Sequence, residues 1–135
     1  MPSYLHPQRV YIEDTDAGGI VYYVNYLKYM ERARTELMRS LGHGKAAIFN
    51  AELMFVVAET QIKYLKPAKL DDELVVSARV LSGKGASLLF EQQVLRNDQI
   101  LCTGTVQVAC VDRHSLKPTR IPAEMLAQLR CTNGE

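Results

Sequence analysis

Apolar residues follow a helical period over one long stretch of the chain. Between residues 27 and 41 they recur at spacings of three and four, which places them on one face of an α-helix. That face holds Leu27, Met30, Ala33, Leu37, Met38 and Leu41, together with Arg34. The pattern predicts a helix over residues 25–41, about 25 Å long at 1.5 Å per residue, with Asn25 as its N-cap and Gly42 as its stop signal. One apolar face on so long a helix needs a broad surface to cover it.

A shorter, strand-like alternation marks several other segments. It predicts strands over residues 8–14, 55–65, 74–81, 87–96 and 100–111, and short helices are predicted over residues 45–50 and 121–129. Short turns join the last three strands, which therefore form an antiparallel meander. No helix is predicted between the strands after residue 55, so the order favours an α+β fold, with one curved antiparallel sheet around the long helix, over a parallel α/β fold. The 135 residues predict a single domain, residues 1–135.

The charge balance restricts the classes of partner. The chain has 16 Lys and Arg residues against 15 Asp and Glu residues, a formal net charge of +1. Nucleic acid and anionic membrane both favour a basic surface, so neither is expected as the main partner, although a local basic patch remains compatible. No apolar stretch approaches the roughly 18 residues of a membrane span, and the N-terminus lacks the pattern of a signal peptide. A cytoplasmic location is predicted.

The residue types used at metal and nucleophile sites do not form a known pattern here. The three cysteines, Cys102, Cys110 and Cys131, have spacings that match no zinc motif, and they are interpreted as small buried hydrophobes in a reducing compartment. The three histidines lie far apart in sequence, so no metal site is predicted. The chain has no G-x-S-x-G elbow, and its Gly83-Lys84-Gly85 turn is too short for a phosphate loop.

An acidic turn before the long helix is the remaining candidate for chemistry. Glu13, Asp14 and Asp16 precede an Ala-Gly-Gly sequence. One interpretation is a solvated turn in which Asp14 or Asp16 caps backbone amides. The other assigns chemistry to Asp16, because free N–H groups at a helix start stabilise an oxyanion and the apolar residues 20–23 would shield the turn from water. A carboxylate there suits acyl transfer to water, as nucleophile or general base.

The same stretch carries a family resemblance. Residues 13–36, EDTDAGGIVYYVNYLKYMERARTE, resemble the signature of hotdog-fold thioesterases of the 4-hydroxybenzoyl-CoA thioesterase type. More narrowly, they are similar to the bacterial acyl-CoA thioesterases associated with the Tol–Pal envelope system. FVVAETQIKYLKPAKLDDEL, SGKGASLLFEQQV and VACVDRHSLKPTRIP are similar to that branch in kind and order, so the resemblance covers nearly the whole chain.

The resemblance implies a long helix wrapped by a five- or six-stranded antiparallel sheet. It also implies a homodimer with the two sheets joined edge to edge, often paired into a tetramer, with active sites at the dimer interface. The family's catalytic aspartate corresponds to Asp16, its oxyanion donor to the backbone amide near Tyr23, and its turn glycine to Gly19. The substrate is an acyl-CoA, so coenzyme A enters as part of the substrate and no cofactor is required.

Further residues are candidates for substrate binding by the same resemblance. Lys84 and Ser87 match a region that contacts the nucleotide end of coenzyme A in relatives, and Lys117 and Arg120 are additional basic candidates. Val24 and Asn25 belong to the motif, although packing or capping is the simpler interpretation of Asn25. Many members of the branch have a histidine where this chain has Tyr23, so Tyr23 acts differently here or its amide acts alone.

Alternatives remain open at this stage. One is a thioesterase for acyl carrier protein instead of coenzyme A, and another is a non-catalytic acyl-thioester binding or scaffold protein. A hotdog dehydratase is less favoured, because no histidine lies beside an acidic partner in the helix region. The sequence leaves the acyl group open, as well as the choice between dimer and tetramer.

Overall fold

The computed structural model describes residues 3–43 and 51–130. In chain order the elements are β1 (Tyr4–Arg9), the 3-10 helix η1 (Ile12–Asp14), α1 (Val24–Ser40), β2 (Leu53–Tyr64), β3 (Glu73–Lys84), β4 (Ser87–Arg96), β5 (Gln99–Asp112) and α3 (Ala123–Arg130). The helix predicted over residues 45–50 lies outside the described residues.

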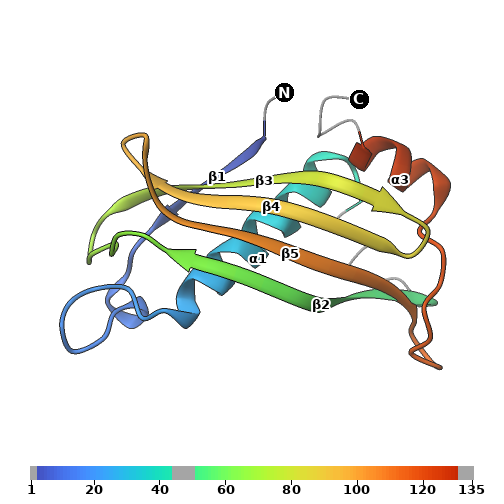
Figure 1. Cartoon of the computed structure of the whole chain (residues 1–135), viewed down its shortest axis with the longest axis horizontal. Helices are drawn as coiled ribbons and strands as arrows, with labels where there is room; N and C mark the ends of the chain where they lie inside the picture. The colour runs from blue at the N-terminus through green and yellow to red at the C-terminus, as the bar shows by residue number, and fades with distance from the viewer. Residues whose placement is uncertain (1–2, 44–50, 131–135) are drawn as a thin grey trace.

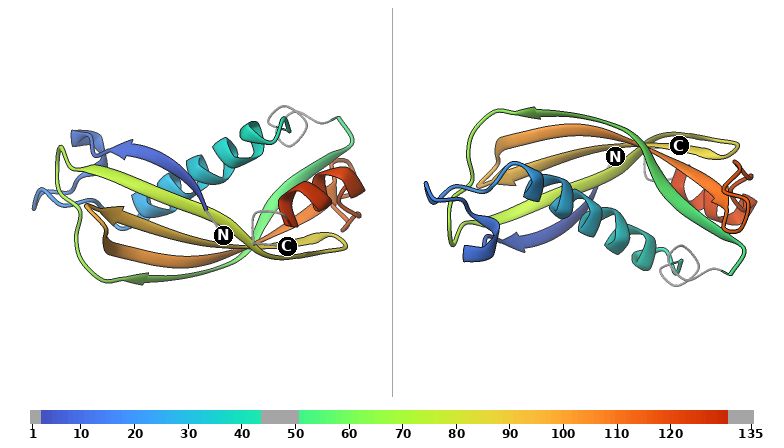
Figure 2. Two further views of the ribbon diagram at one scale, coloured as in Figure 1. Left: turned by 90° about the horizontal axis from the view of Figure 1, so that it is seen from above. Right: turned by 90° about the horizontal axis from the view of Figure 1, so that it is seen from below.

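The five strands form one antiparallel sheet in the order β1-β3-β4-β5-β2. The sheet is strongly curved, α1 crosses one of its faces diagonally, and α3 lies on the same side near one end (Figures 1 and 2). The predicted α+β arrangement of a long helix wrapped by a curved antiparallel sheet is confirmed, with five strands. The predicted meander is also confirmed as β3, β4 and β5.

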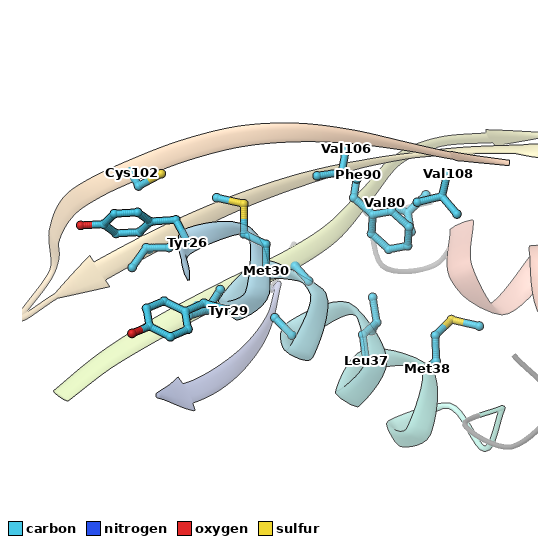
Figure 3. Close-up of a cluster of buried hydrophobic side chains, with 14 of the residues drawn as sticks. Tyr26, Tyr29, Met30, Leu37, Met38, Val80, Phe90, Cys102, Val106 and Val108 are labelled. Carbon is cyan, nitrogen blue, oxygen red and sulfur yellow. The ribbon is translucent and has the colours of Figure 1, made fainter. Parts of the chain in front are cut away.

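The core lies between α1 and the concave face of the sheet. Every second residue of β4 from Leu88 to Val94 is buried, as a strand with one covered face requires. Leu37 and Met38 of α1 point toward Phe90 of that strand (Figure 3). The buried residues of α1 are Asn25, Tyr26, Tyr29, Met30, Ala33, Leu37 and Met38. Leu27, predicted on the buried face, is 37% exposed, because the face turned to the sheet is centred on Tyr26, Met30 and Ala33 instead.

The N-terminal region differs from the prediction. The strand predicted over residues 8–14 is wrong: β1 occupies Tyr4–Arg9, and Ile12–Asp14 form η1. Pro7 lies within β1, which a strand at the sheet edge tolerates. The carboxylate of Asp14 accepts the amide of Tyr11 at 2.9 Å, which stabilises the tight turn in place of an extended chain.

The boundaries of α1 also differ from the prediction. The helix begins at Val24 with Tyr23 as its N-cap residue, so the assignment of Asn25 as N-cap is wrong. Gly42 has φ +84°, a left-handed conformation that favours glycine after a helix, and the predicted stop is confirmed. No helix among the described residues is both long and apolar enough to cross a membrane.

β2 forms one edge of the sheet, and among the strands of residues 3–43 and 51–130 it pairs with β5 alone. Cys102 and Cys110 on β5 are buried and form no disulfide, which confirms their interpretation as small buried hydrophobes. Cys131 lies outside the described residues.

Candidate active site

The turn that carries Asp16 is closed by its own backbone. The amide of Tyr22 donates to the carbonyl of Asp14 at 2.9 Å, and the amide of Asp16 donates to the carbonyl of Ile20 at 2.9 Å. The amide of Val21 donates to the carbonyl of Ala68 at 2.8 Å, which attaches the turn to the segment between β2 and β3. We call residues 14–22 the Asp16 turn. Its end connects directly to the start of α1, so Asp16 and the helix start are held in one unit.

Asp16 caps a backbone amide with one carboxylate oxygen and leaves the other oxygen available for chemistry. Its side chain is exposed, and its Oδ1 accepts the amide of Gly18 at 2.9 Å. The second carboxylate oxygen accepts no hydrogen bond from the described part of the chain. One oxygen therefore fixes the side chain against the turn while the other remains available to a water molecule or a thioester carbon.

Gly19 has the conformation that the turn requires. Its φ is +80°, which L side chains rarely adopt, and no atom lies within 4 Å of the position that a Cβ would take. At Gly18 a Cβ would lie 3.3 Å from Oδ1 of Asp16. The two glycines thus serve different purposes: Gly19 allows the left-handed turn beside open space, and Gly18 leaves room for the carboxylate.

The helix start presents two amides without acceptors. The N–H groups of Tyr23 and Val24 donate to no backbone or side-chain acceptor within residues 3–43 and 51–130. The carbonyl of Tyr22, in the same peptide unit as the Tyr23 amide, accepts the amide of Asn25 at 2.8 Å. Free N–H groups at a helix N-terminus attract negative charge. They are the donors that an oxyanion needs.

Aromatic rings surround this helix start. The ring of Tyr23 lies 5.0 Å from that of Tyr22 and 6.3 Å from that of Tyr64, between centroids. The hydroxyl of Tyr64 donates to the carbonyl of Tyr23 at 3.3 Å. The C-terminal end of β2 is therefore attached to the beginning of α1.

The expectation that apolar residues 20–23 shield the turn is wrong for a single chain. Val21 is buried, but Ile20 is 36%, Tyr22 48% and Tyr23 57% exposed. Of these four residues only Val21 joins the core, at the bridge that it forms with Thr15.

Asn25 lies inside the protein and does not cap the helix, in line with the packing interpretation of this residue. Its side chain is buried, and its Nδ2 donates to Oδ1 of Asp14 at 2.9 Å. It therefore faces the protein interior, which favours packing over direct contact with substrate. Asp14 is buried as well, and it accepts the amide of Tyr11, as the interpretation of a capping carboxylate in the acidic turn predicted; the prediction of a solvated position is wrong for Asp14.

The four basic-region candidates gather at one end of the sheet. Lys84 and Ser87 flank the turn between β3 and β4, and the amide of Ile121 donates to the carbonyl of Gly85 in that turn at 2.9 Å. This bond brings the neighbouring Arg120 beside the turn, and Lys117 lies in the same loop before α3. Lys84, Lys117 and Arg120 are exposed, and Ser87 Oγ accepts Gln107 Nε2 at 3.1 Å. We call these four residues the basic end.

The basic end and the Asp16 turn lie at opposite ends of one chain (Figure 1). β4 begins at Ser87 and ends at Arg96, which forms an ion pair with Asp72 at 2.6 Å. Asp72 lies beside the Asp16 turn, because Lys69, three residues earlier, pairs with Ile20. At about 3.3 Å per residue the two ends are separated by about 30 Å. One chain does not bring the catalytic and basic candidates together.

A cavity lies between the second half of α1 and the sheet. Its volume is about 480 Å³, and its walls come from α1, β2, β4 and β5. Most of the lining is apolar, including Met38, Phe55 and Phe90, while Arg34 adds a guanidinium group. Arg34 donates to Oε1 of the buried Gln92 at 2.9 Å, a structural contact between helix and sheet.

Comparison with known proteins decides the family. The profile of the Thioesterase-like superfamily matches residues 10–129. An acyl-CoA thioesterase YbgC from Haemophilus influenzae is 48% identical over 122 residues, which cover 90% of this chain and 90% of that protein. The chain belongs to the thioesterase-like superfamily. An acyl-CoA thioester hydrolase YbgC from Escherichia coli O157:H7 is 38% identical, over 92% of this chain and 93% of that protein.

Solved structures agree with this membership. A probable thioesterase from Bartonella henselae superposes with a TM-score of 0.82 at 32% identity, over 90% of this chain and 100% of that chain. A 1,4-dihydroxy-2-naphthoyl-CoA thioesterase from Synechocystis superposes with a TM-score of 0.81 at 17% identity, over 96% of each chain, and at that identity it shows the fold alone. This thioesterase-like chain has the hotdog fold that its sequence resembles. Among its described residues no three His, Cys, Asp or Glu side chains come together as a metal site would require.

Proposed function

We propose that the protein hydrolyses acyl-CoA thioesters to a free acid and coenzyme A, with Asp16 as the catalytic carboxylate. The observation that carries this proposal is the free oxygen of Asp16 in one rigid unit with a helix start whose Tyr23 and Val24 amides lack acceptors. The relatives at 48% and 38% identity, described as an acyl-CoA thioesterase and an acyl-CoA thioester hydrolase, support the substrate class. They also favour coenzyme A over acyl carrier protein as the carrier of the acyl group.

The chemistry follows from these groups. Asp16 removes a proton from water, whose oxygen attacks the thioester carbonyl carbon, or it attacks that carbon directly and the resulting anhydride is hydrolysed. In either route the carbonyl oxygen becomes an oxyanion, and the amide of Tyr23 donates to it. The C–S bond then breaks, and the coenzyme A thiolate takes up a proton. Gly19 leaves the space beside Asp16 open for the thioester.

A second copy of the chain completes the site in this proposal. The position of β2 at the edge of the described sheet suits antiparallel pairing of β2 with β2 from a second copy, around a two-fold axis. Such an axis reverses the ends of the partner's sheet, so that the partner's basic end and the Asp16 turn come to the same end of the combined sheet. The nucleotide phosphates of coenzyme A then lie against Lys84, Lys117 and Arg120 of one copy while the thioester reaches Asp16 of the other.

The same pairing suggests where the acyl group of the substrate binds. Tyr64 attaches the C-terminal end of β2 to the start of α1, whereas Met54 and Phe55 near the N-terminal end of β2 line the 480 Å³ cavity. Antiparallel pairing brings the C-terminal end of β2 in one copy beside the N-terminal end of β2 in the other. An acyl group held by Asp16 of one copy is thereby directed toward the apolar cavity of its partner.

Two broader assignments belong to this proposal. A single thioesterase domain over residues 1–135 is supported by the profile match over residues 10–129 and by one cluster of buried residues that extends from Val10 to Leu129. A cytoplasmic location is supported by Cys102 and Cys110, which are both unpaired.

The deciding experiment is a panel of short, long and aromatic acyl-CoA substrates tested on the wild type and on Asp16→Asn. The substitution keeps the shape and the Gly18 contact but removes the basic oxygen, so turnover of the best substrate should fall at least about a hundredfold. Asp98→Asn changes an exposed aspartate in the turn between β4 and β5 and should have no effect. Near-normal hydrolysis by Asp16→Asn would sink the mechanism. The same acyl group presented on acyl carrier protein tests the choice of carrier.

A further inference from the structure

Asp14 is a buried carboxylate next to the candidate active site. It is 4% exposed, and none of the ion pairs within the described residues includes it. Its Oδ2 accepts the amide of Tyr11, and its Oδ1 accepts Nδ2 of Asn25, both at 2.9 Å. A buried carboxyl group depends on its hydrogen-bond partners, so removing either donor should cost free energy.

Asp14 and Asn25 together hold one particular peptide unit. The carbonyl of Asp14 accepts the amide of Tyr22, and the amide of Asn25 donates to the carbonyl of Tyr22. That carbonyl and the N–H of Tyr23 belong to the same planar trans peptide, in which they point in opposite directions. Fixing the Tyr22 carbonyl therefore fixes the direction of the Tyr23 N–H.

The side-chain bond between Asp14 and Asn25 closes this arrangement. Asp14 begins the Asp16 turn, and Asn25 lies in the first turn of α1. Their bond connects the segment that carries the carboxylate to the segment that carries the amide donor. Tyr29, one helical turn after Asn25, has a fully buried hydroxyl with no hydrogen-bond partner in residues 3–43 and 51–130. That hydroxyl is close enough to the Asp14 carboxyl to interact with it, although no hydrogen bond of ordinary geometry joins them. Burial first, and then this interaction with Asp14, raise the pKa of Tyr29, while the Arg32 guanidinium, over its ring, acts in the opposite direction.

We propose that Asp14 and Asn25 are positioning residues whose buried carboxylate–amide pair holds the Tyr22–Tyr23 peptide at a fixed orientation to Asp16. The inference rests on the proposed function, because it assumes that Asp16 and the Tyr23 amide act on the thioester. Its consequence is that the pair contributes to turnover more than to substrate binding, since a preorganised oxyanion donor acts in the transition state.

A reciprocal exchange tests the pair. Asn25→Asp alone buries two carboxylates together, whereas Asp14→Asn alone can keep a bond to position 25 if the Asn25 amide turns by about 180° and presents its oxygen. In the double variant D14N/N25D, Asn Oδ1 at position 14 accepts the Tyr11 amide and its Nδ2 donates to the new carboxylate at position 25, so every bond is restored. Asn25→Asp should lower kcat about 10- to 100-fold, with KM within about threefold, and the double variant should recover most of kcat.

Stability must be measured beside kinetics, because a buried pair also contributes to folding. Circular dichroism and thermal unfolding identify a temperature at which each variant is folded, and Asn25→Ala removes the donor without adding a charge if a single variant fails to fold. Wild-type kcat in a folded Asn25→Ala or Asn25→Asp would overturn the inference, as would a stable double variant that stays as slow as Asn25→Asp. Asp16→Asn is assayed in parallel: its near-normal turnover refutes the proposed function, whereas its loss with unchanged Asn25 variants refutes only the positioning role.

Discussion

At the scale of single residues, Cys102 shows how burial controls reactivity. Its side chain has no exposed surface, and burial raises the pKa of its thiol to about 12. Since the thiolate is the reactive form, the folded protein keeps this cysteine inert near neutral pH. An unfolded cysteine titrates near about 8.5. This group therefore has no effect on the pH dependence of stability below that value, and it lowers the free energy of unfolding as the pH rises from there toward 12.

We expect iodoacetamide at pH 8 to modify Cys102 only after unfolding. The measurement is a pulse of reagent with and without denaturant, followed by mass spectrometry of the peptide that contains Cys102. Cys102→Ala should show a smaller loss of stability than the wild type between pH 8.5 and 11, once its lower stability at pH 7 is subtracted. Labelling of Cys102 in the native protein at the rate of an exposed thiol would contradict the assigned burial.

The neighbouring carboxylates Asp14 and Asp16 differ in how far the sequence predicts their roles. Both lie in one acidic turn, and the resemblance selects Asp16 for chemistry. Nothing in the local pattern reveals that Asp14 is buried and bonded to Asn25, because that contact joins η1 to α1 across eleven residues. The same contact explains why Asn25, a good N-cap by residue type, serves a different purpose.

At the scale of elements, the attachment of β2 to β5 depends on a glycine. Ile62 and Gly104 are opposite each other in the register. A Cβ at Gly104 would lie 2.5 Å from Cδ1 of Ile62 and 3.1 Å from the carbonyl oxygen of Gln61. The first neighbour can move, but the second is backbone, so an added methyl group displaces the edge strand itself.

Gly104→Ala should lower the free energy of unfolding by about 1–3 kcal/mol, the usual cost of overpacking. Ile62→Val removes only the Cδ1 atom, so Gly104→Ala should cost less in that background, yet still cost something because the Gln61 carbonyl remains. Thr105→Ala, at the next position of β5, adds no atom and serves as the control. Urea unfolding measures all four variants, and an unchanged midpoint for Gly104→Ala would show that β2 adapts freely.

Elements with a strong local period were predicted well. The strand over residues 87–96 coincides with β4, and the helix predicted over residues 25–41 differs from α1 by one residue at each end. The prediction failed at β1, where Pro7 interrupts the pattern and the edge position decides the outcome. Periodicity reports which residues face a core, but it carries no information on which strand lies at the edge.

At the scale of the whole molecule, the separation of the Asp16 turn from the basic end is the main result that the sequence did not reveal. Both groups were predicted from motif positions, but their distance depends on how the strands are ordered and where each one ends. The antiparallel meander places the β3–β4 turn at the end of the sheet opposite the Asp16 turn (Figure 1). A site formed within one chain and a site shared by two chains therefore lead to different expected activities in mixed oligomers.

Mixed oligomers separate these two cases. One parent carries Asp16→Asn and the other carries Lys84→Glu with Arg120→Glu, which reverses the charge of the basic end without touching the Asp16 turn. If each active site combines Asp16 of one copy with the basic end of the other, a mixed dimer has one active site with both parts intact and one with both parts altered. One of its two sites is then intact, so the isolated mixed dimer should regain about half of the wild-type activity at low acyl-CoA concentration.

A site within one chain gives the opposite result. Every subunit of a mixed dimer then has one defective group, and the mixture is no more active than the average of its parents. The two variants are co-expressed with different affinity tags, and the doubly tagged species is isolated before assay, so that only mixed oligomers are measured. A wild-type pair with the same two tags sets the reference value. Recovery in the mixed species, with both parents nearly inactive, would require that Asp16 of one copy works with the basic end of the other.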